Sequence, residues 1–397
     1  MTVKNKITLK SAQRLACLSL LFILGAYLVP HNWCAREAGA VFKDEEGIQE
    51  RMARQAVKML SLELGRANFK TGSELFNGEW LFGTYMMSGM GFGQMAVLHP
   101  DKADEYLPHM ENCIRKILEP QVREFDTHSW GNDPIESLDT DFDHAAFLGY
   151  YNLLLSLHRL LKKDSEFSAL NDRITAALAR RLEKSSVLLL QTYPNEMYPV
   201  DNCAVFGSIG LYDMATGGDH SALLARCMEK LKKDYTDPRS GLLYQCIDGF
   251  TGKMLDAPRG SGTCLGLYFL SFSEPSISRS LYDSAKRELK GGVLGFGGMK
   301  EYPASAEGGF GDIDSGPVIF GYGVSPTGFM IAGTRIHDDY ALFRKLYATA
   351  YLCGAPCDSG GSRLFVTGGH IGNAIMFAVM TAPSEWKFND FCMRRKK

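Results

Sequence analysis

Acidic and aromatic residues gather in a few short turns of this chain, each just ahead of an apolar, glycine-rich segment. Carboxyl groups that are crowded and partly buried acquire separated pKa values, which is what paired acid–base catalysis requires. Taken together, these turns predict a chemical site. Its candidate residues are Glu79, Trp80, Trp130, Asp133, Glu136, Asp141, His144, Tyr198, Asp201, Asn202, Cys203, Arg259, Asp312, Asp314 and His370.

Several of these residues have a structural role open to them as well. Asp201 stands where a helix N-cap is expected, and His144 is compatible with a hydrogen-bonded core histidine. Asp312–Gly316 has the composition of a turn, without the spacing or terminal glutamate of an EF-hand loop. The sequence has no Cys/His zinc spacing, phosphate loop or dinucleotide fingerprint. We therefore expect no metal and no cofactor, and a cation held by Asp312 and Asp314 is the one rival.

The elements that must position these residues are helices of two alternating kinds. One kind is amphipathic, with an apolar stripe on one face and charges on the other. The amphipathic helices are expected at Glu45–Ala67, Asp101–Leu118, Phe167–Ser186, Ser221–Tyr235, Pro275–Leu289 and Asp338–Leu352. The other kind is apolar nearly all round, so it must be buried. The apolar helices are expected at Gly83–Leu98, Asp143–Leu161, Asn202–Thr216, Gly262–Phe272, Pro326–Arg335 and Gly372–Ala382.

Six buried helices alternating with six half-exposed ones predict two concentric rings, an all-α (α/α)6 barrel. A less regular all-α domain is the alternative, and short strands are expected only at Gly241–Ile247 and Leu364–Thr367. In the barrel the inner helices run the same way, so the turns that precede them meet at one end, the mouth. Helix N-termini favour negative charge.

One geometric expectation follows from the parallel inner helices. The residues Glu79, Asp141, Asp201, Arg259 and Asp314 all precede or begin such helices. We therefore expect them to lie around a single cavity at the mouth.

The N-terminus has the pattern of a targeting or anchoring segment. Four basic residues within the first 14 positions precede an apolar run, Leu15–Val29. This is typical of a secretory signal peptide, or of one membrane anchor with its basic end inside. Ala38–Ala40 has the form of a cleavage site, and a buried N-terminal helix is the third possibility. We expect residues 1–40 to be the signal or anchor, residues 41–390 an extracytoplasmic barrel, periplasmic or secreted, and residues 391–397 a basic tail.

Composition narrows the class of protein. With 43 Lys+Arg against 45 Asp+Glu, the net charge of −2 argues against a nucleic-acid binder. Hydrophobic residues make up 45% and charged residues 22%, which fits a globular domain. The ten cysteines form no CxxC pair, and we expect no disulfide framework.

The stretch Trp130–Glu136, WGNDPIE, resembles the linalool dehydratase/isomerase family. Members of that family are (α/α)6 barrels with an aromatic-Gly-x-Asp-Pro-Ile-Glu stretch, and the likeness continues at Tyr198–Cys203 and Lys233–Gly241. The resemblance implies cofactor-free removal or addition of water at an allylic alcohol, with allylic rearrangement, in an apolar cavity. The family uses cysteines, an aspartate, tyrosines and a histidine. Here Cys203 stands alone where the family has a cysteine pair, and Tyr193 takes the first position.

Two enzymatic functions are compatible with this sequence. Under the first, implied by the resemblance, the enzyme is a hydro-lyase or isomerase acting on a terpenoid-like alcohol or alkene. Asp133 or Glu136 then orients the substrate. The residues that exchange protons are Asp141, His144, Tyr198, Asp201 and Cys203. Under the second, the barrel is a glycosidase or polysaccharide lyase, by analogy of fold. Asp141 or Asp143 would pair with Asp201 across a glycosidic bond, and Trp80 and Trp130 would stack sugars.

A third function is a non-catalytic binding barrel on a membrane anchor. A cavity that is apolar below its rim favours the first function, a broad cleft with exposed tryptophans the second, and a plugged mouth the third. Self-association into a homo-oligomer is compatible with all three.

Overall fold

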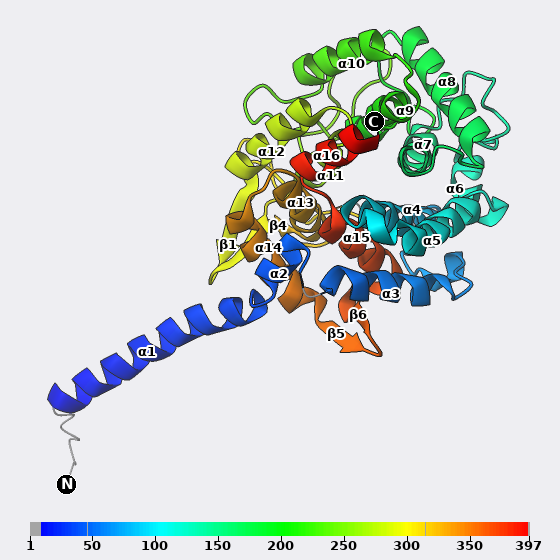
Figure 1. The fold of residues 1–397 in the computed structure, drawn as a ribbon. Helices are drawn as coiled ribbons and strands as arrows, with labels where there is room; N and C mark the ends of the chain where they lie inside the picture. The colour runs from blue at the N-terminus through cyan, green and yellow to red at the C-terminus, as the bar shows by residue number, and fades with distance from the viewer. Residues whose placement is uncertain (1–8, 46, 314, 396–397) are drawn as a thin grey trace.

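Outer and inner helices alternate along residues 9–45, 47–313 and 315–395, which the computed structural model describes (Figure 1). The outer helices are α3 (Ile48–Leu60), α5 (Ala103–Ile117), α8 (Ser168–Lys184), α10 (Ser221–Asp234), α12 (Pro275–Leu289) and α14 (Tyr340–Gly354). The inner helices are α4 (Glu74–Leu98), α7 (Ala145–Leu161), α9 (Pro199–Thr216), α11 (Gly260–Leu270), α13 (Val324–Ile336) and α15 (Gly369–Thr381). The predicted (α/α)6 barrel is confirmed.

The inner helices form a closed ring. Each contacts the next in the order α4, α7, α9, α11, α13 and α15, and α15 returns to contact α4. In α9 every residue from Asp201 to Leu211 is buried, because its neighbours and the outer ring enclose it. Outer helices such as α3 bury only one face, which includes Met52, Ala56 and Met59.

Glycines set the spacing inside this ring. A Cβ added at Gly207 of α9 would lie 2.4 Å from the carbonyl oxygen of Phe269 in α11. A Cβ added at Gly149 of α7 would lie 3.1 Å from the backbone nitrogen of Val205. The backbones of neighbouring inner helices therefore pack at a distance that only glycine allows at these positions.

Shorter elements surround the two rings. They are helices α1 (Leu9–Cys34), α2 (Ala38–Lys43), α6 (Pro120–Trp130) and α16 (Glu385–Arg395), with 3-10 turns η1 (Arg66–Asn68), η2 (Pro100–Lys102) and η3 (Val366–Gly368). Three antiparallel hairpins pair β1 (Lys290–Val293) with β2 (Phe296–Met299), β3 (Val318–Ile319) with β4 (Tyr322–Gly323), and β5 (Pro356–Ser359) with β6 (Ser362–Phe365). Our expected strand at Leu364–Thr367 overlaps β6, whereas Gly241–Ile247 forms only isolated bridges.

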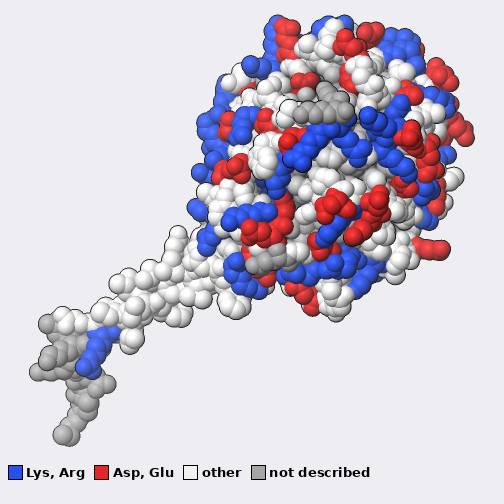
Figure 2. Space-filling model, viewed as in Figure 1, with Lys and Arg blue, Asp and Glu red and all other residues white. Residues whose placement is uncertain are grey.

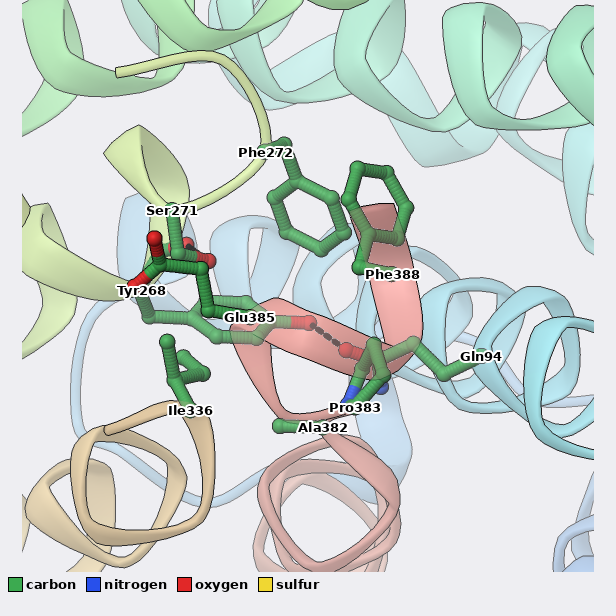
Figure 3. Close-up of a pocket in the computed structure, with 9 residues that line it drawn as sticks. All are labelled: Gln94, Tyr268, Ser271, Phe272, Ile336, Ala382, Pro383, Glu385 and Phe388. Carbon is green, nitrogen blue, oxygen red and sulfur yellow. Dashed lines mark hydrogen bonds between the residues drawn. The ribbon is translucent and has the colours of Figure 1, made fainter. Parts of the chain in front are cut away.

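The end of the barrel opposite the mouth is closed by α16. Phe388, Phe391 and Cys392 of this helix are buried, so residues 391–395 belong to a packed helix and not to a solvated tail. Beneath α16 lies a cavity of about 10 Å³ at the C-terminal ends of the inner helices, lined by residues that include Gln94 and Tyr268 (Figure 3). That volume holds about one water molecule, so the base has no room for a substrate.

The segment Gln13–Lys43 is the one stretch of the described residues long and apolar enough to cross a membrane. The side chains of Leu15–Val29 in α1 are exposed or nearly so, and α1 projects from the barrel as an apolar rod (Figures 1 and 2). Its end packs on α14, where Cys34 is buried. Of the basic residues that precede the apolar run, Lys4 and Lys6 lie outside the described residues.

We expect Gly207→Ala to destabilise the barrel by about 1–3 kcal/mol, because a backbone oxygen fills the space and the helices must move apart. Gly328→Ala in α13 is the matched control, since a Cβ there meets no atom within 4 Å. Alanine is the better helix former, so this variant should gain up to about 1 kcal/mol. Urea unfolding of both variants in one detergent measures the difference. A Gly207→Ala variant as stable as the Gly328→Ala variant would contradict the packing described.

Candidate functional site

The inner helices leave one face partly exposed near their N-termini, although the outer ring covers their backs. The partly exposed residues are Trp80 and Gly83 of α4, Ala146 and Tyr150 of α7, Gly262 and Leu265 of α11, Gly328 of α13, and Ile371, Gly372, Ile375 and Met376 of α15. Spacings of three and four residues place those of each helix on one face. This face borders the axis of the barrel, and we call the space it surrounds the lumen.

The lumen is open space with apolar walls. A Cβ added at Gly328 or Gly372 would meet no atom within 4 Å. Below these glycines the lumen has an aromatic floor, in which the Tyr150 ring lies edge-on to Phe269 at 4.7 Å and to Phe82 at 6.4 Å between centroids. The residues that border the lumen are therefore mostly apolar.

Asp201 brings a buried carboxyl group to the rim from the first turn of α9. Its Oδ1 accepts a hydrogen bond from the Tyr150 hydroxyl at 2.7 Å, and its Oδ2 accepts one from Thr192 at 2.6 Å. Burial raises the pKa of Asp201, and the two hydroxyl donors offset only part of that effect. A carboxyl group whose pKa is raised holds a proton more readily than an exposed one does, which suits a general acid.

A second carboxyl group, that of Glu79 in α4, accepts a hydrogen bond from the Tyr193 hydroxyl. Burial raises the pKa of Tyr193 well above its ordinary value, and Glu79 raises it further. Asp126 and Asp201 act on Tyr193 in the same direction, so these acids are close enough to interact. Two carboxyl–tyrosine pairs therefore lie near each other. Glu79 of α4 pairs with Tyr193 from the loop before α9, and Asp201 of α9 pairs with Tyr150 of α7.

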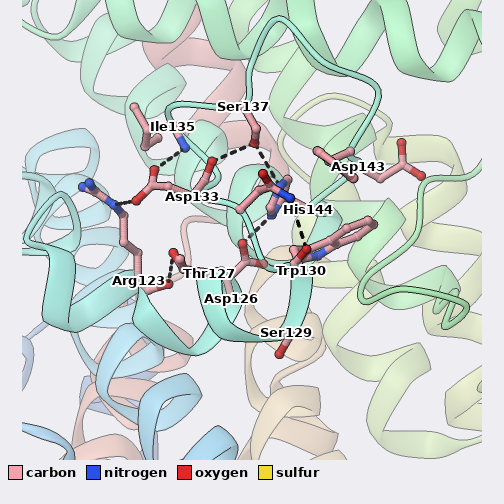
Figure 4. A network of polar contacts seen from close by, with 12 residues as sticks. Arg123, Asp126, Thr127, Ser129, Trp130, Asp133, Ile135, Ser137, Asp143 and His144 are labelled. Carbon is pink, nitrogen blue, oxygen red and sulfur yellow. Dashed lines mark hydrogen bonds and ion pairs between the residues drawn. The ribbon is translucent and has the colours of Figure 1, made fainter.

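His144 lies behind this rim and is fully buried. Its Nδ1 lies 2.5 Å from Asp126 Oδ2 and its Nε2 lies 3.0 Å from Ser137 Oγ (Figure 4). The Trp130 ring packs against it at 4.7 Å between centroids, and Trp130 Nε1 donates to the carbonyl of Thr192. Both nitrogens of His144 have partners, so it holds α6 and the loop before α7 in place.

The WGNDPIE stretch forms a structural turn. Asp133 Oδ2 is 2.5 Å from Arg123 Nε, and Asp133 Oδ1 accepts hydrogen bonds from the backbone of Ile135 and Glu136 (Figure 4). The Glu136 side chain is exposed. Asp141 is 71% exposed and pairs with Lys184 at 2.6 Å on the outer surface. The structure thus leaves Asp133, Glu136 and Asp141 outside the lumen, because the loop that carries them turns outward before α7 begins.

The neighbours of Asp201 point away from the lumen. Asn202 is fully buried and exchanges hydrogen bonds with the backbone of Leu190, at 2.7 and 2.9 Å. Cys203 is also fully buried, against Gly266 of α11, and burial raises the pKa of its thiol. Tyr198 is half-buried and its hydroxyl donates to Glu196. Of Asp201, Asn202 and Cys203, only Asp201 is hydrogen-bonded to a residue of the lumen face, Tyr150.

Arg259 belongs to a second polar cluster, at the start of α11. Its guanidinium lies 2.7 Å from Glu301 and 2.5 Å from Asp312, and Glu301 also accepts a hydrogen bond from Ser261. Burial raises the pKa of Glu301, against the lowering effects of Ser261 and Arg259. The cluster ties the loop before α13 to α11.

The remaining candidates are spread around the rim. His370 is half-buried and its ring contacts Phe69 at 5.9 Å, whereas Trp80 is a partly buried wall residue of the lumen. Asp314 lies outside the described residues. Among the residues that the structure describes, no group of three or more His, Cys, Asp or Glu side chains is placed to hold a metal ion.

Gln245 is a polar residue at the rim that the sequence did not single out. It is 8% exposed, and its Oε1 has no hydrogen-bond partner. A Cβ added at Gly262, on the lumen face of α11, would lie 3.3 Å from this oxygen. A buried acceptor without a donor beside the lumen is suited to a substrate hydroxyl.

Known proteins resemble this chain both in sequence and in fold. Residues 139–292 match the family described as linalool dehydratase/isomerase. The predicted resemblance to that family is confirmed. The matched segment runs from the loop before α7 into β1, and it contains Tyr150, Thr192, Tyr193 and Asp201. No curated protein matches the chain.

Solved structures share the barrel. A GH76 α-mannanase from Bacteroides thetaiotaomicron is 8% identical, with a TM-score of 0.50 over 88% of this chain and 98% of that chain. An unsaturated glucuronyl hydrolase specific for heparin is 10% identical, with a TM-score of 0.51 over 90% of this chain and 98% of that chain. At such identities the likeness shows the fold alone.

Arg181 of α8 holds the loop that carries the WGNDPIE stretch, by donating to the carbonyls of Ser137, Leu138, Thr140 and Asp143. Burial lowers its pKa to about 10, so it stays charged at neutral pH. We expect Arg181→Leu to cost about 2–4 kcal/mol in unfolding free energy, because the variant removes four hydrogen bonds from a buried guanidinium. Arg180 and Thr140 still donate to the carbonyls of Ser137, Leu138 and Thr140, so the Asp143 carbonyl is the one most affected.

The control is Arg173→Leu on the same helix. Its side chain is 55% exposed with one ion pair of 3.8 Å, so the change should stay within about 0.5 kcal/mol. Thermal and urea unfolding measure both variants. Equal losses in the two would show that the loop does not depend on Arg181.

Proposed function

We propose that this protein is a cofactor-independent acid–base enzyme of the linalool dehydratase/isomerase type. It removes water from, adds water to or rearranges a small apolar alcohol or alkene in the lumen. The observation that carries the proposal is a pair of carboxyl groups beside the apolar lumen, the buried Asp201 and the partly buried Glu79, each of which accepts a hydrogen bond from a tyrosine hydroxyl. The family match over residues 139–292 supports it.

Dehydration needs an acid at the departing hydroxyl and a base at a neighbouring C–H bond. In the proposed reaction Asp201, whose pKa burial raises, takes up a proton and donates it to the Tyr150 oxygen, while the Tyr150 hydroxyl turns and gives its own proton to the substrate hydroxyl. The C–O bond breaks and water leaves, while the Glu79 carboxylate beside Tyr193 accepts the proton from carbon as the double bond forms. Gln245 accepts a hydrogen bond from the substrate hydroxyl and orients it. Hydration is the same sequence in reverse.

The carbohydrate alternative has less support. It rests on the shared barrel, which carries many unrelated functions. Asp141 would have to approach the sugar, but its carboxylate pairs with Lys184 on the outer surface. Trp130 would have to stack on the sugar, but its ring already packs on His144.

We also propose that the barrel works outside the cytoplasm. The apolar helix α1 supports this assignment, since basic residues near its start favour the inner side of a membrane.

The direct test is to incubate the purified full-length protein with a panel of allylic alcohols that includes linalool. Gas chromatography then detects alkene and rearranged alcohol. In this assay we expect Asp201→Asn to lower turnover by about 10²–10⁴, because the amide keeps the shape but cannot deliver the proton. The sequence suggested Asp201 as a helix cap, but Tyr198 is the N-cap of α9 and the Asp201 carboxyl group accepts hydrogen bonds from two hydroxyls instead. The amide oxygen of asparagine can keep one of these two bonds, so the unfolding free energy should fall by about 1–2 kcal/mol.

The matched control is Asp141→Asn, which alters a solvent-exposed carboxylate in the same matched segment. Its turnover should equal that of the unaltered protein. Near-normal turnover of a folded Asp201→Asn variant would remove Asp201 from the mechanism. Products from saccharides but from no alcohol would replace the proposal with the carbohydrate alternative.

The open space at Gly328 and Gly372 allows an independent test of the lumen as the binding site. Gly328→Leu and Gly372→Leu place an isobutyl group in that space without a clash at Cβ. We expect each to fold at least as stably as the unaltered protein, since leucine is the better helix former by about 0.5–1 kcal/mol. Each should lower kcat/KM for any substrate bound in the lumen.

Gly65→Leu controls for the substitution itself, because its Cβ also meets no atom within 4 Å and Gly65 lies outside the barrel wall. Unchanged kinetics in both lumen variants would place the substrate elsewhere.

A further inference from the structure

The turn between β1 and β2 is unusual in its chemistry. Val293 and Leu294 form an apolar tip that is 53% and 60% exposed. Leu294 and Gly295 have φ of +49° and +86°, so both central residues of this two-residue hairpin turn are left-handed. Turns of this kind favour Asn-Gly, because asparagine tolerates positive φ far better than leucine does. An exposed leucine held in a strained turn points to a function for its apolar side chain.

The anchor helix lies directly beside this turn. A Cβ added at Gly295 would lie 2.4 Å from His31 Nδ1, and the Phe296 and His31 rings are 6.2 Å apart between centroids. His31 comes two residues after Val29, the last residue of the apolar run. At a rise of about 1.5 Å per residue, the contact lies only about 3 Å along α1 from the end of that run. Figure 1 shows the β1–β2 hairpin pointing the same way as α1.

The end of α1 is fixed to the barrel, so this juxtaposition is rigid. Ala38 and Val41 are fully buried. Glu37 pairs with the buried Arg363 at 2.7 Å, and Arg335 donates to the carbonyl of Val41 at 2.6 Å. Cleavage after Ala40 would remove Ala38 and Glu37 from the packed barrel. The folded structure therefore uses the segment that a signal peptidase would discard.

From these observations we propose that α1 is retained as a membrane anchor and that the tip formed by Val293 and Leu294 is a second contact with the same bilayer. A hydrophobic side chain at the level where the apolar run ends lies in the membrane interface. Tyr27 and Trp33 flank that level on α1, as aromatic residues do at membrane interfaces. Two contacts fix the tilt of the barrel on the membrane, which a single helix would leave free. This inference does not depend on the proposed reaction.

The test uses the full chain in vesicles of phosphatidylethanolamine and phosphatidylglycerol. A photoreactive benzoylphenylalanine replaces Leu294 in one variant and Leu255 in the other. Leu255 is the matched control, because it is 62% exposed in the loop before α11. After illumination, mass spectrometry should find several-fold more lipid adduct at position 294 than at position 255. Equal adduct at the two positions, or adduct to protein alone at position 294, would overturn the proposal.

Two further measurements exclude simpler explanations. The intact mass of the purified protein should include residues 1–40, and their absence would also overturn the proposal. Leu294→Asn should raise the melting temperature in detergent, because asparagine relieves the turn. A lower melting temperature would show that Leu294 is kept for packing within the protein and would count against a membrane role.

Discussion

Each inner helix is enclosed by the outer ring behind it, by a neighbour on either side and by the lumen in front. Such a helix satisfies its own backbone but has few positions for polar side chains, because desolvating them without partners is costly. Close approach also demands glycine where backbones meet, as at Gly207. Chemistry in the lumen therefore has to come from the first turns of the helices and from the loops above them. Asp201, Thr192 and Tyr193 stand at such places, and Tyr150 reaches them with its hydroxyl from within α7.

This constraint explains why the fold could be predicted from the sequence. A helix that is apolar all round has one explanation in a chain of ordinary composition, which is enclosure by other helices. All twelve predicted helices occur in the order expected, with limits shifted by a few residues at most ends. The largest shift is at α4, which begins at Glu74 and not at Gly83, so that Glu79 lies within a helix. The β1–β2 hairpin could not be predicted from the sequence, because KGGV and FGGM lack the alternation of apolar and polar residues that indicates a strand.

The site was harder to predict, because closeness along the sequence does not decide which way a side chain faces. Asp141 and His144 are three residues apart, yet one is on the outer surface and the other is fully buried. Glu301 gave no local signal, since its burial depends on Arg259, 42 positions earlier. Tyr150 lies in a helix that is apolar nearly all round, so the sequence pattern predicts a packing role for it and gives no sign of its hydrogen bond to Asp201. The N-terminal position of Asp201 on an inner helix was the one signal that led directly to the rim.

The closed base determines how substrate enters the lumen and how product leaves it. With α16 and an aromatic floor beneath the lumen, the barrel that the described residues form opens at one end. Whatever enters must leave by the same route, so a product and any released water have to depart before the next molecule arrives. A polymer could not thread through such a barrel and could present only its end. The architecture therefore suits short molecules that bind one at a time. The width of the mouth, more than the depth of the lumen, limits their size.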